Sequence, residues 1–147
     1  MKQALKLIFT GVLLSYTPMA LAADWTSITT NAAGDKFFVD KSSLQKTGEI
    51  ARYWEYREFP QPNNAFLETK VEQPVHGAVI QWSVDCQNKS QRLRQLIAYD
   101  KKRAVIRKFN YGDTGSLTQP RSGSSASTVL NYVCAPPENS GSGAVQQ

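Results

Sequence analysis

The chain has 147 residues, of which 41% are hydrophobic and 20% are charged, and its formal net charge is +5. This is the composition of an ordinary globular protein and it excludes an intrinsically disordered chain. The length fits a single domain with a modest hydrophobic core.

Residues 1–22 have the features of a secretory signal peptide. Lys2 and Lys6 give a positive start, Leu5–Leu14 form a short apolar run, and residues 20–22 supply small side chains for a cleavage site. The apolar run is shorter than the roughly 20 residues that a transmembrane helix needs, and no later segment comes close, so we expect an exported chain that does not span a membrane. No cysteine follows the run. We therefore expect no lipid anchor, and a location in the periplasm or at the cell surface on the outer membrane.

The hydrophobic period between Asp35 and Tyr111 is two, which is typical of half-buried β-strands. Five strands are expected, at residues 35–40, 49–59, 78–86, 91–100 and 104–111. Because the connections are short enough for antiparallel neighbours, we expect one antiparallel meander of five to six strands. Residues 60–64, with two prolines and two asparagines, predict a loop.

The third and fourth expected strands assign side chains to faces. On the third strand the core face carries Ala78, Ile80, Trp82, Val84 and Cys86. On the fourth strand one face is expected to carry Leu93, Ile97 and Tyr99. The opposite face is expected to carry Arg92, Arg94 and Ala98. Residues 100–103 then predict a hairpin turn.

The aromatic segment at residues 52–57 has two interpretations. Aromatic and arginine side chains are favoured at recognition hot spots, yet a residue such as Tyr53 or Trp54 is more often a core residue. The aromatic side chains of this strand do not all point to one face. We therefore expect both faces of the strand to be partly covered.

The period changes to that of a helix near the C-terminus. One apolar stripe is formed by Ala126, Val129, Leu130, Val133 and Cys134. Ser124 or Ser125 is expected to cap its start, and Pro136 to end it. The chain has only two cysteines, and in an exported protein they predict a disulfide between Cys86 and Cys134 that ties the helix to the sheet. The expected fold is thus α+β, with a domain at residues 23–135 and a flexible tail at 136–147.

Basic residues are concentrated in the second half of the chain. Residues 24–85 hold nine acids and six bases, whereas residues 86–147 hold three acids and nine bases. A single acid, Asp100, opposes the bases between Lys89 and Lys108. The candidate ligand-binding residues are Lys89, Arg92, Arg94, Lys101, Lys102, Arg103, Arg107 and Lys108. Such a cluster attracts anionic glycans, envelope components or acidic protein segments; alternatively, its charges only solubilise an edge hairpin.

Signs of catalysis are weak. The one histidine, His76, lies in an expected loop, and no serine or cysteine motif accompanies it. Two distant cysteines and one histidine are too few ligands for a zinc site, and no glycine-rich phosphate loop is present. We therefore expect a protein that is not an enzyme and has no catalytic residues, metal or cofactor. Nucleic acid is not an expected partner, because the chain is exported.

These residues resemble the surface-adhesin protein E family of Gram-negative bacteria. The resemblance runs from about Asp24 to Cys134 and rests on Trp25, residues 34–40, 53–56, 84–86 and 98–100, and the 124–134 helix. It implies an antiparallel sheet with a C-terminal helix held by a disulfide. It also implies binding to host extracellular-matrix and serum proteins such as vitronectin, laminin and plasminogen, and it suggests a homodimer.

The sequence therefore leaves two alternative functions. The first is an exported, adhesin-like binding module that contacts its ligand through the basic hairpin at residues 89–108. The second is a soluble periplasmic protein that uses the same face to bind an internal component of the envelope.

Overall fold

The computed structural model describes residues 23–136. The expected signal peptide at residues 1–22 lies outside the described residues, as do residues 137–147 of the expected tail. The described elements are β1 (Trp25–Thr30), β2 (Lys36–Asp40), the 3-10 turn η1 (Lys41–Ser43), β3 (Gln45–Thr47), β4 (Ile50–Glu58), β5 (Gly77–Asp85), β6 (Ser90–Tyr99), β7 (Val105–Asn110), β8 (Leu117–Thr118) and α2 (Ser125–Cys134).

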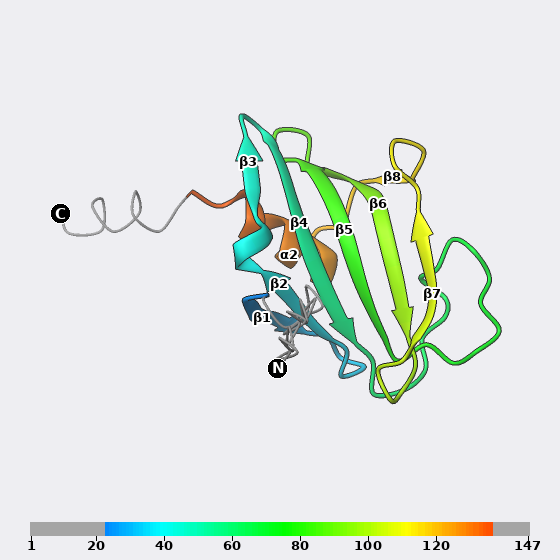
Figure 1. The fold of residues 1–147 in the computed structure, drawn as a ribbon. Coiled ribbons are helices and arrows are strands. Elements are labelled where there is room, and N and C mark those ends of the chain that lie inside the picture. The colour runs from blue at the N-terminus through cyan, green and yellow to red at the C-terminus, as the bar shows by residue number, and fades with distance from the viewer. Residues whose placement is uncertain (1–22, 137–147) are drawn as a thin grey trace, which may run out of the picture.

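The strands form one antiparallel sheet in the order β1-β2-β4-β5-β6-β7 (Figure 1). Two short strands extend it, because β3 pairs with the first residues of β4 and β8 pairs with the first residues of β6. The predicted single sheet with a C-terminal helix is confirmed. The sequence did not indicate β1, β3 or β8, since β3 and β8 are two or three residues long and fully exposed, and β1 is mostly Thr and Ser.

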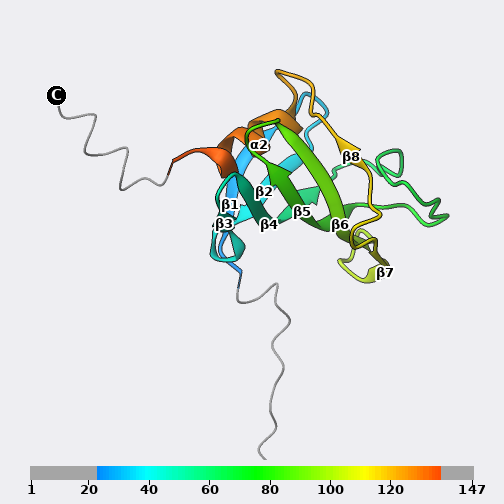
Figure 2. The same cartoon turned by 90° about the horizontal axis from the view of Figure 1, so that it is seen from above.

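Helix α2 lies against one face of this sheet, next to β1 and β2 (Figures 1 and 2). We call this face the inner face and the opposite one the outer face. The side chain of Ser124 caps the helix by accepting a hydrogen bond from the backbone N–H of Ser127, and Val129, Leu130 and Val133 are buried. Cys134 at the end of α2 forms the predicted disulfide with Cys86, which follows β5.

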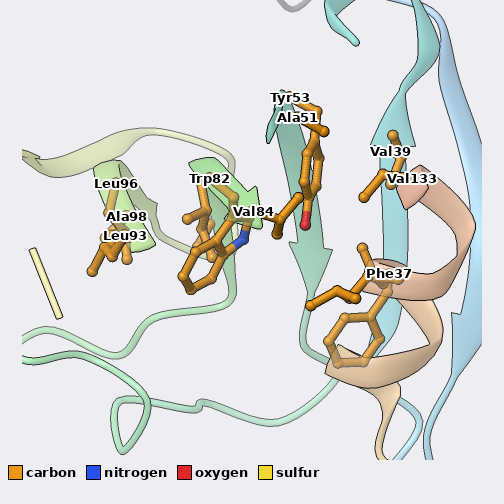
Figure 3. Packing of buried hydrophobic residues seen from close by; sticks show 14 of the residues in the cluster. Phe37, Val39, Ala51, Tyr53, Trp82, Val84, Leu93, Leu96, Ala98 and Val133 are labelled. Carbon is orange, nitrogen blue, oxygen red and sulfur yellow. The ribbon is translucent and has the colours of Figure 1, made fainter. Parts of the chain in front are cut away.

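The inner face of the sheet and the helix together form the hydrophobic core (Figure 3). Its buried members on the strands include Phe37, Val39, Ala51, Tyr53, Ala78, Ile80, Trp82, Val84, Leu93, Leu96 and Ala98. The alternation predicted for β5 is therefore confirmed from Ala78 to Val84.

The face assignment predicted for β6 is wrong beyond Leu93. Trp82 pairs with Leu93 but Gln81 pairs with Gln95, so Arg94 is an extra residue in a β-bulge. The extra residue inverts the alternation that follows. Ala98 is consequently buried in the core, while Ile97 and Tyr99 lie on the outer face.

A long loop, residues 59–76, connects β4 to β5 and packs Phe66, Leu67 and Val71 against the core. Asn64 organises the loop, because its side chain donates to the carbonyls of Val71 and Gln73 and accepts from the backbone N–H of Val75. Phe66 of this loop packs on Phe59 with ring centroids 5.2 Å apart. The loop predicted at residues 60–64 is thus the start of a longer ordered segment.

Candidate functional site

The turn between β6 and β7 presents three exposed cations at one end of the sheet. We call Lys101, Lys102 and Arg103 the basic turn. The carboxylate of Asp100 holds its backbone, since Oδ1 accepts from the N–H groups of Lys102 at 2.8 Å and Ala104 at 2.9 Å. Arg103 has a φ of 62°, in the left-handed region, and its N–H donates to the carbonyl of Asp100. Asp100, the one acid of this segment, therefore binds the backbone of the turn.

Arg92 and Arg94 of β6 contact the loop between β7 and β8. Nη1 of Arg92 donates to the carbonyls of Asp113 and Gly115, and Nη1 of Arg94 donates to the carbonyl of Gly112 and to the Asp113 carboxylate. Both guanidinium groups are thus occupied by contacts within the protein. Their immediate role is to hold the 112–115 loop against β6.

The remaining cations of the predicted cluster are separated. Lys89 lies at the opposite end of β6 from the basic turn, and its Nζ donates to Oδ1 of Asn131 on α2. The Arg107 guanidinium lies over the Phe109 ring, 4.9 Å from its centroid. Lys108 pairs with Ile97 and lies on the outer face of the edge strand β7. The fold therefore brings together only Lys101, Lys102 and Arg103 as an exposed group.

A buried ion pair on β4 is a feature that the sequence analysis missed. Nε of Arg57 lies 2.5 Å from Oε1 of Glu55, and the two side chains are 14% and 1% exposed. The Glu55 oxygen also accepts a hydrogen bond from Nε1 of Trp82 at 3.2 Å. The Arg57 guanidinium lies 5.1 to 5.9 Å from the ring centroids of Phe37, Trp82 and Phe66. The strict alternation of β4, which places residues 55 and 57 on one face, was the signal that could have revealed it.

The aromatic side chains of β4 divide between the two faces, as predicted. Tyr53 is buried in the core, and burial, reinforced by the neighbouring Glu55 carboxylate, raises the pKa of its hydroxyl well above the ordinary value. Trp54 and Tyr56 are half-buried on the outer face, where the Tyr56 ring packs on those of Phe38 and Trp25.

His76 precedes β5, as the sequence predicts. Its backbone joins two strand ends, because its N–H donates to the carbonyl of Tyr99 and its own carbonyl accepts from the N–H of Phe59. Nδ1 lies 3.2 Å from the Phe59 carbonyl. Within residues 23–136 no three His, Cys, Asp or Glu side chains group as a metal site. In the same part of the chain, no helix is both long and apolar enough to cross a membrane.

Residues 25–135, which make up most of the chain, match the surface-adhesin protein E family. The chain belongs to this family. Among solved structures, one form of Haemophilus influenzae protein E has a similar fold, with a TM-score of 0.51 and 8% sequence identity over 75% of this chain and 86% of that one. No curated protein matches the chain. The family is one of surface adhesins, and at 8% identity the protein E structure supports the shared fold alone.

Proposed function

We propose that this member of the surface-adhesin protein E family is an exported, non-enzymatic binding module that contacts its ligand through the basic turn. The observation that carries the proposal is the exposure of Lys101, Lys102 and Arg103 on a backbone held by Asp100. The candidate ligands are host matrix and serum proteins such as vitronectin, laminin and plasminogen, or another anionic ligand.

The rigidity of the turn favours binding. A flexible loop loses conformational entropy when a ligand immobilises it, and a loop already held by hydrogen bonds loses less. The carboxylate of Asp100 is directed at the backbone, so the ligand meets the three cations first. Complementary charges mainly raise the association rate and the specificity, and they are screened by salt.

A charge-matched pair of variants tests this role. The turn variant carries Lys101→Gln, Lys102→Gln and Arg103→Asn, because asparagine tolerates the left-handed backbone at this position. The control carries Lys41→Gln, Lys70→Gln and Arg121→Gln, three exposed cations outside the turn. Surface plasmon resonance on immobilised vitronectin, laminin and plasminogen at several salt concentrations gives the affinities.

We expect the turn variant to bind about tenfold more weakly, with a smaller salt dependence. The control should stay within about twofold of the parent protein. Equal losses in both variants would mean that only net charge matters, and no loss in the turn variant would refute the contact site.

Two substitutions of Asp100 separate charge from rigidity. Asp100→Asn keeps an oxygen that accepts the two backbone hydrogen bonds, whereas Asp100→Ala removes it; both variants change the net charge equally. If the held turn matters, Asp100→Asn should bind at least as well as the parent protein and Asp100→Ala more weakly. Equal affinities of the two variants would assign the effect to charge alone.

Location decides between the adhesin and the alternative, a periplasmic protein that binds an envelope component. Intact cells are treated with protease, and the protein is then detected in cell, periplasmic and outer-membrane fractions. Loss of the protein while a periplasmic marker survives would support the adhesin. Full protection, with release by osmotic shock, would favour the periplasmic alternative.

A further inference from the structure

A hollow of about 200 Å³ lies beside the basic turn, where β4 ends, β5 begins and β6 ends. Lys101 and Arg103 of the turn line one side of it, and Tyr56, Tyr99 and Gly77 contribute from the strands. The hollow thus joins the cations of the turn to aromatic side chains on the outer face of the sheet.

Gly77 keeps the floor of the hollow open. It is buried at the first position of β5, between Glu58 on β4 and Tyr99 on β6. Its φ is not in the left-handed region, so the backbone conformation does not require glycine. A Cβ at this position would lie 3.4 Å from the Tyr56 ring and 3.5 Å from its hydroxyl. A glycine inside a strand often marks the close approach of a ligand, and here it leaves the Tyr56 ring accessible.

The two tyrosines offer both apolar and polar contacts. A tyrosine hydroxyl keeps its proton at neutral pH, because its ordinary pKa is about 10. Burial raises the pKa of Tyr56 and of Tyr99 further, so both hydroxyls can donate hydrogen bonds. Among the described residues, neither hydroxyl has a side-chain or backbone hydrogen-bond partner. Both residues are half-buried and line the hollow.

The charged groups of the hollow are of both signs. Nη2 of Arg103 is 4.0 Å from Oε1 of Glu58, and the side chains are 77% and 41% exposed, so solvent weakens this pair. A ligand carboxylate can therefore take the place of Glu58 on Arg103, with Lys101 beside it. The Glu58 carboxylate is then free to accept hydrogen bonds from hydroxyl groups, but it would repel a ligand that carries several carboxylates.

We propose that the hollow binds the terminal residue of an acidic glycan, a single pyranose ring that carries one carboxylate. Tyr56 and Tyr99 contact the ring, Lys101 and Arg103 bind the carboxylate, and Glu58 accepts from the sugar hydroxyls. A sugar ring with one carboxylate and several hydroxyls has a partner for the two cations, the two phenol groups and the Glu58 carboxylate. A polyacidic peptide has no hydroxyls for Glu58 and would be repelled by it. The inference rests on the proposed function, because it gives a ligand class to the same turn.

The test follows backbone amide NMR signals of the protein during titration with three probes. Glucuronic acid carries the proposed chemistry, glucose lacks the carboxylate, and hexaglutamate is an acidic peptide. Because the hollow is small, we expect millimolar binding of glucuronic acid, about tenfold tighter than that of glucose, with shifts at Gly77, Tyr99 and residues 101–103.

Two variants and a control locate the binding. Gly77→Ala adds a methyl group at ordinary contact distances, so it should narrow the hollow without unfolding the protein. We expect it and Tyr99→Phe each to weaken glucuronic acid binding by roughly three- to tenfold. Tyr111→Phe removes a tyrosine hydroxyl outside the hollow and should have no effect.

Three results would overturn the inference: no shifts at Gly77 and Tyr99, equal binding of hexaglutamate at these amides, or unchanged binding in Gly77→Ala. The proposed function can fail separately. If the turn variant loses host-protein binding while glucuronic acid fails to bind the parent protein, the turn is the contact site and the hollow is not. If glucuronic acid binds in the hollow while the turn variant keeps host-protein binding, the hollow stands and the turn is not the protein contact.

Discussion

The buried pair of Glu55 and Arg57 gives the sharpest test of the core. Replacement of Arg57 by methionine keeps the apolar length of the side chain but leaves the Glu55 carboxylate, 1% exposed, without its partner at 2.5 Å. Breaking a buried ion pair from one side costs about 3–5 kcal/mol, because the remaining charge is desolvated and unpaired. We therefore expect Arg57→Met to lower the free energy of unfolding by about that amount.

Removing both charges should cost far less. In the double variant Glu55→Gln/Arg57→Met, the glutamine oxygen can still accept from Nε1 of Trp82, and the methionine can pack between the rings of Phe37 and Phe66. Replacing a whole buried pair is often neutral or stabilising, so the double variant should lie within about 1.5 kcal/mol of the parent protein.

The assay is urea denaturation with the disulfide intact, with free energies of unfolding obtained by linear extrapolation for the parent, both single variants and the double variant. Arg52→Met, an exposed arginine on the same strand, is the matched control and should change the free energy by less than about 0.5 kcal/mol. If the two single effects sum to the double effect within about 0.5 kcal/mol, the pair is not coupled and the reasoning is refuted.

Three further predictions concern stability. The disulfide closes a separation of 48 residues; in the chain-entropy model this contributes about 4 kcal/mol, so Cys86→Ala/Cys134→Ala should lower the Tm in calorimetry by more than about 10 °C, and an unchanged Tm would contradict this role. The Tyr53 hydroxyl is buried without a partner in the described chain and its pKa is raised, so stability is lost as pH rises above about 10, where only the unfolded state ionises. Tyr53→Phe should cost little at pH 7 and shift the alkaline unfolding midpoint upward in a circular-dichroism titration; an unshifted midpoint would argue against it. A Cβ on Gly115 would lie 1.7 Å from the carbonyl oxygen of Leu93, so Gly115→Ala should cost at least about 2 kcal/mol in urea denaturation, and a smaller loss would show that the 112–115 loop moves freely.

Local sequence patterns were sufficient to predict a strand or helix where hydrophobic residues dominated one of its faces. The alternation from Ala78 to Val84 predicts β5 and its core face, and the stripe ending in Cys134 predicts α2. The bulge at Arg94 could not be predicted in this way, because the segment around it alternates acceptably in either register and only the pairing with β5 selects one. The short strands β3 and β8 could not be predicted either, because neither has a buried residue and each is defined only by its pairing with a neighbouring strand.

The candidate site shows the same division. The hairpin turn at residues 100–103 follows from its own sequence, whereas the contacts of Arg92 and Arg94 join residues about 20 positions apart and depend on the path of the 112–115 loop. The hollow beside Gly77 is even harder to predict from the sequence. Its lining comes from three strand ends that meet only after the sheet has formed.

Charge counts along a sequence overstate the size of a binding surface because they ignore what each cation already contacts. Arg92 and Arg94 donate hydrogen bonds to backbone carbonyls of the 112–115 loop, and Arg94 also pairs with the Asp113 carboxylate. A ligand would have to displace these contacts, which hold the loop. Among the cations of the basic turn, only Arg103 has a charged partner in the described part of the chain, and its Nη2 lies 4.0 Å from Oε1 of Glu58. We therefore expect an anionic ligand to gain most at the turn and least along β6. Mutating the basic segment as a whole would therefore combine a loss of binding at the turn with a loss of stability along β6. Among substitutions of the basic residues, those confined to residues 101–103 test the proposed recognition without disturbing the 112–115 loop.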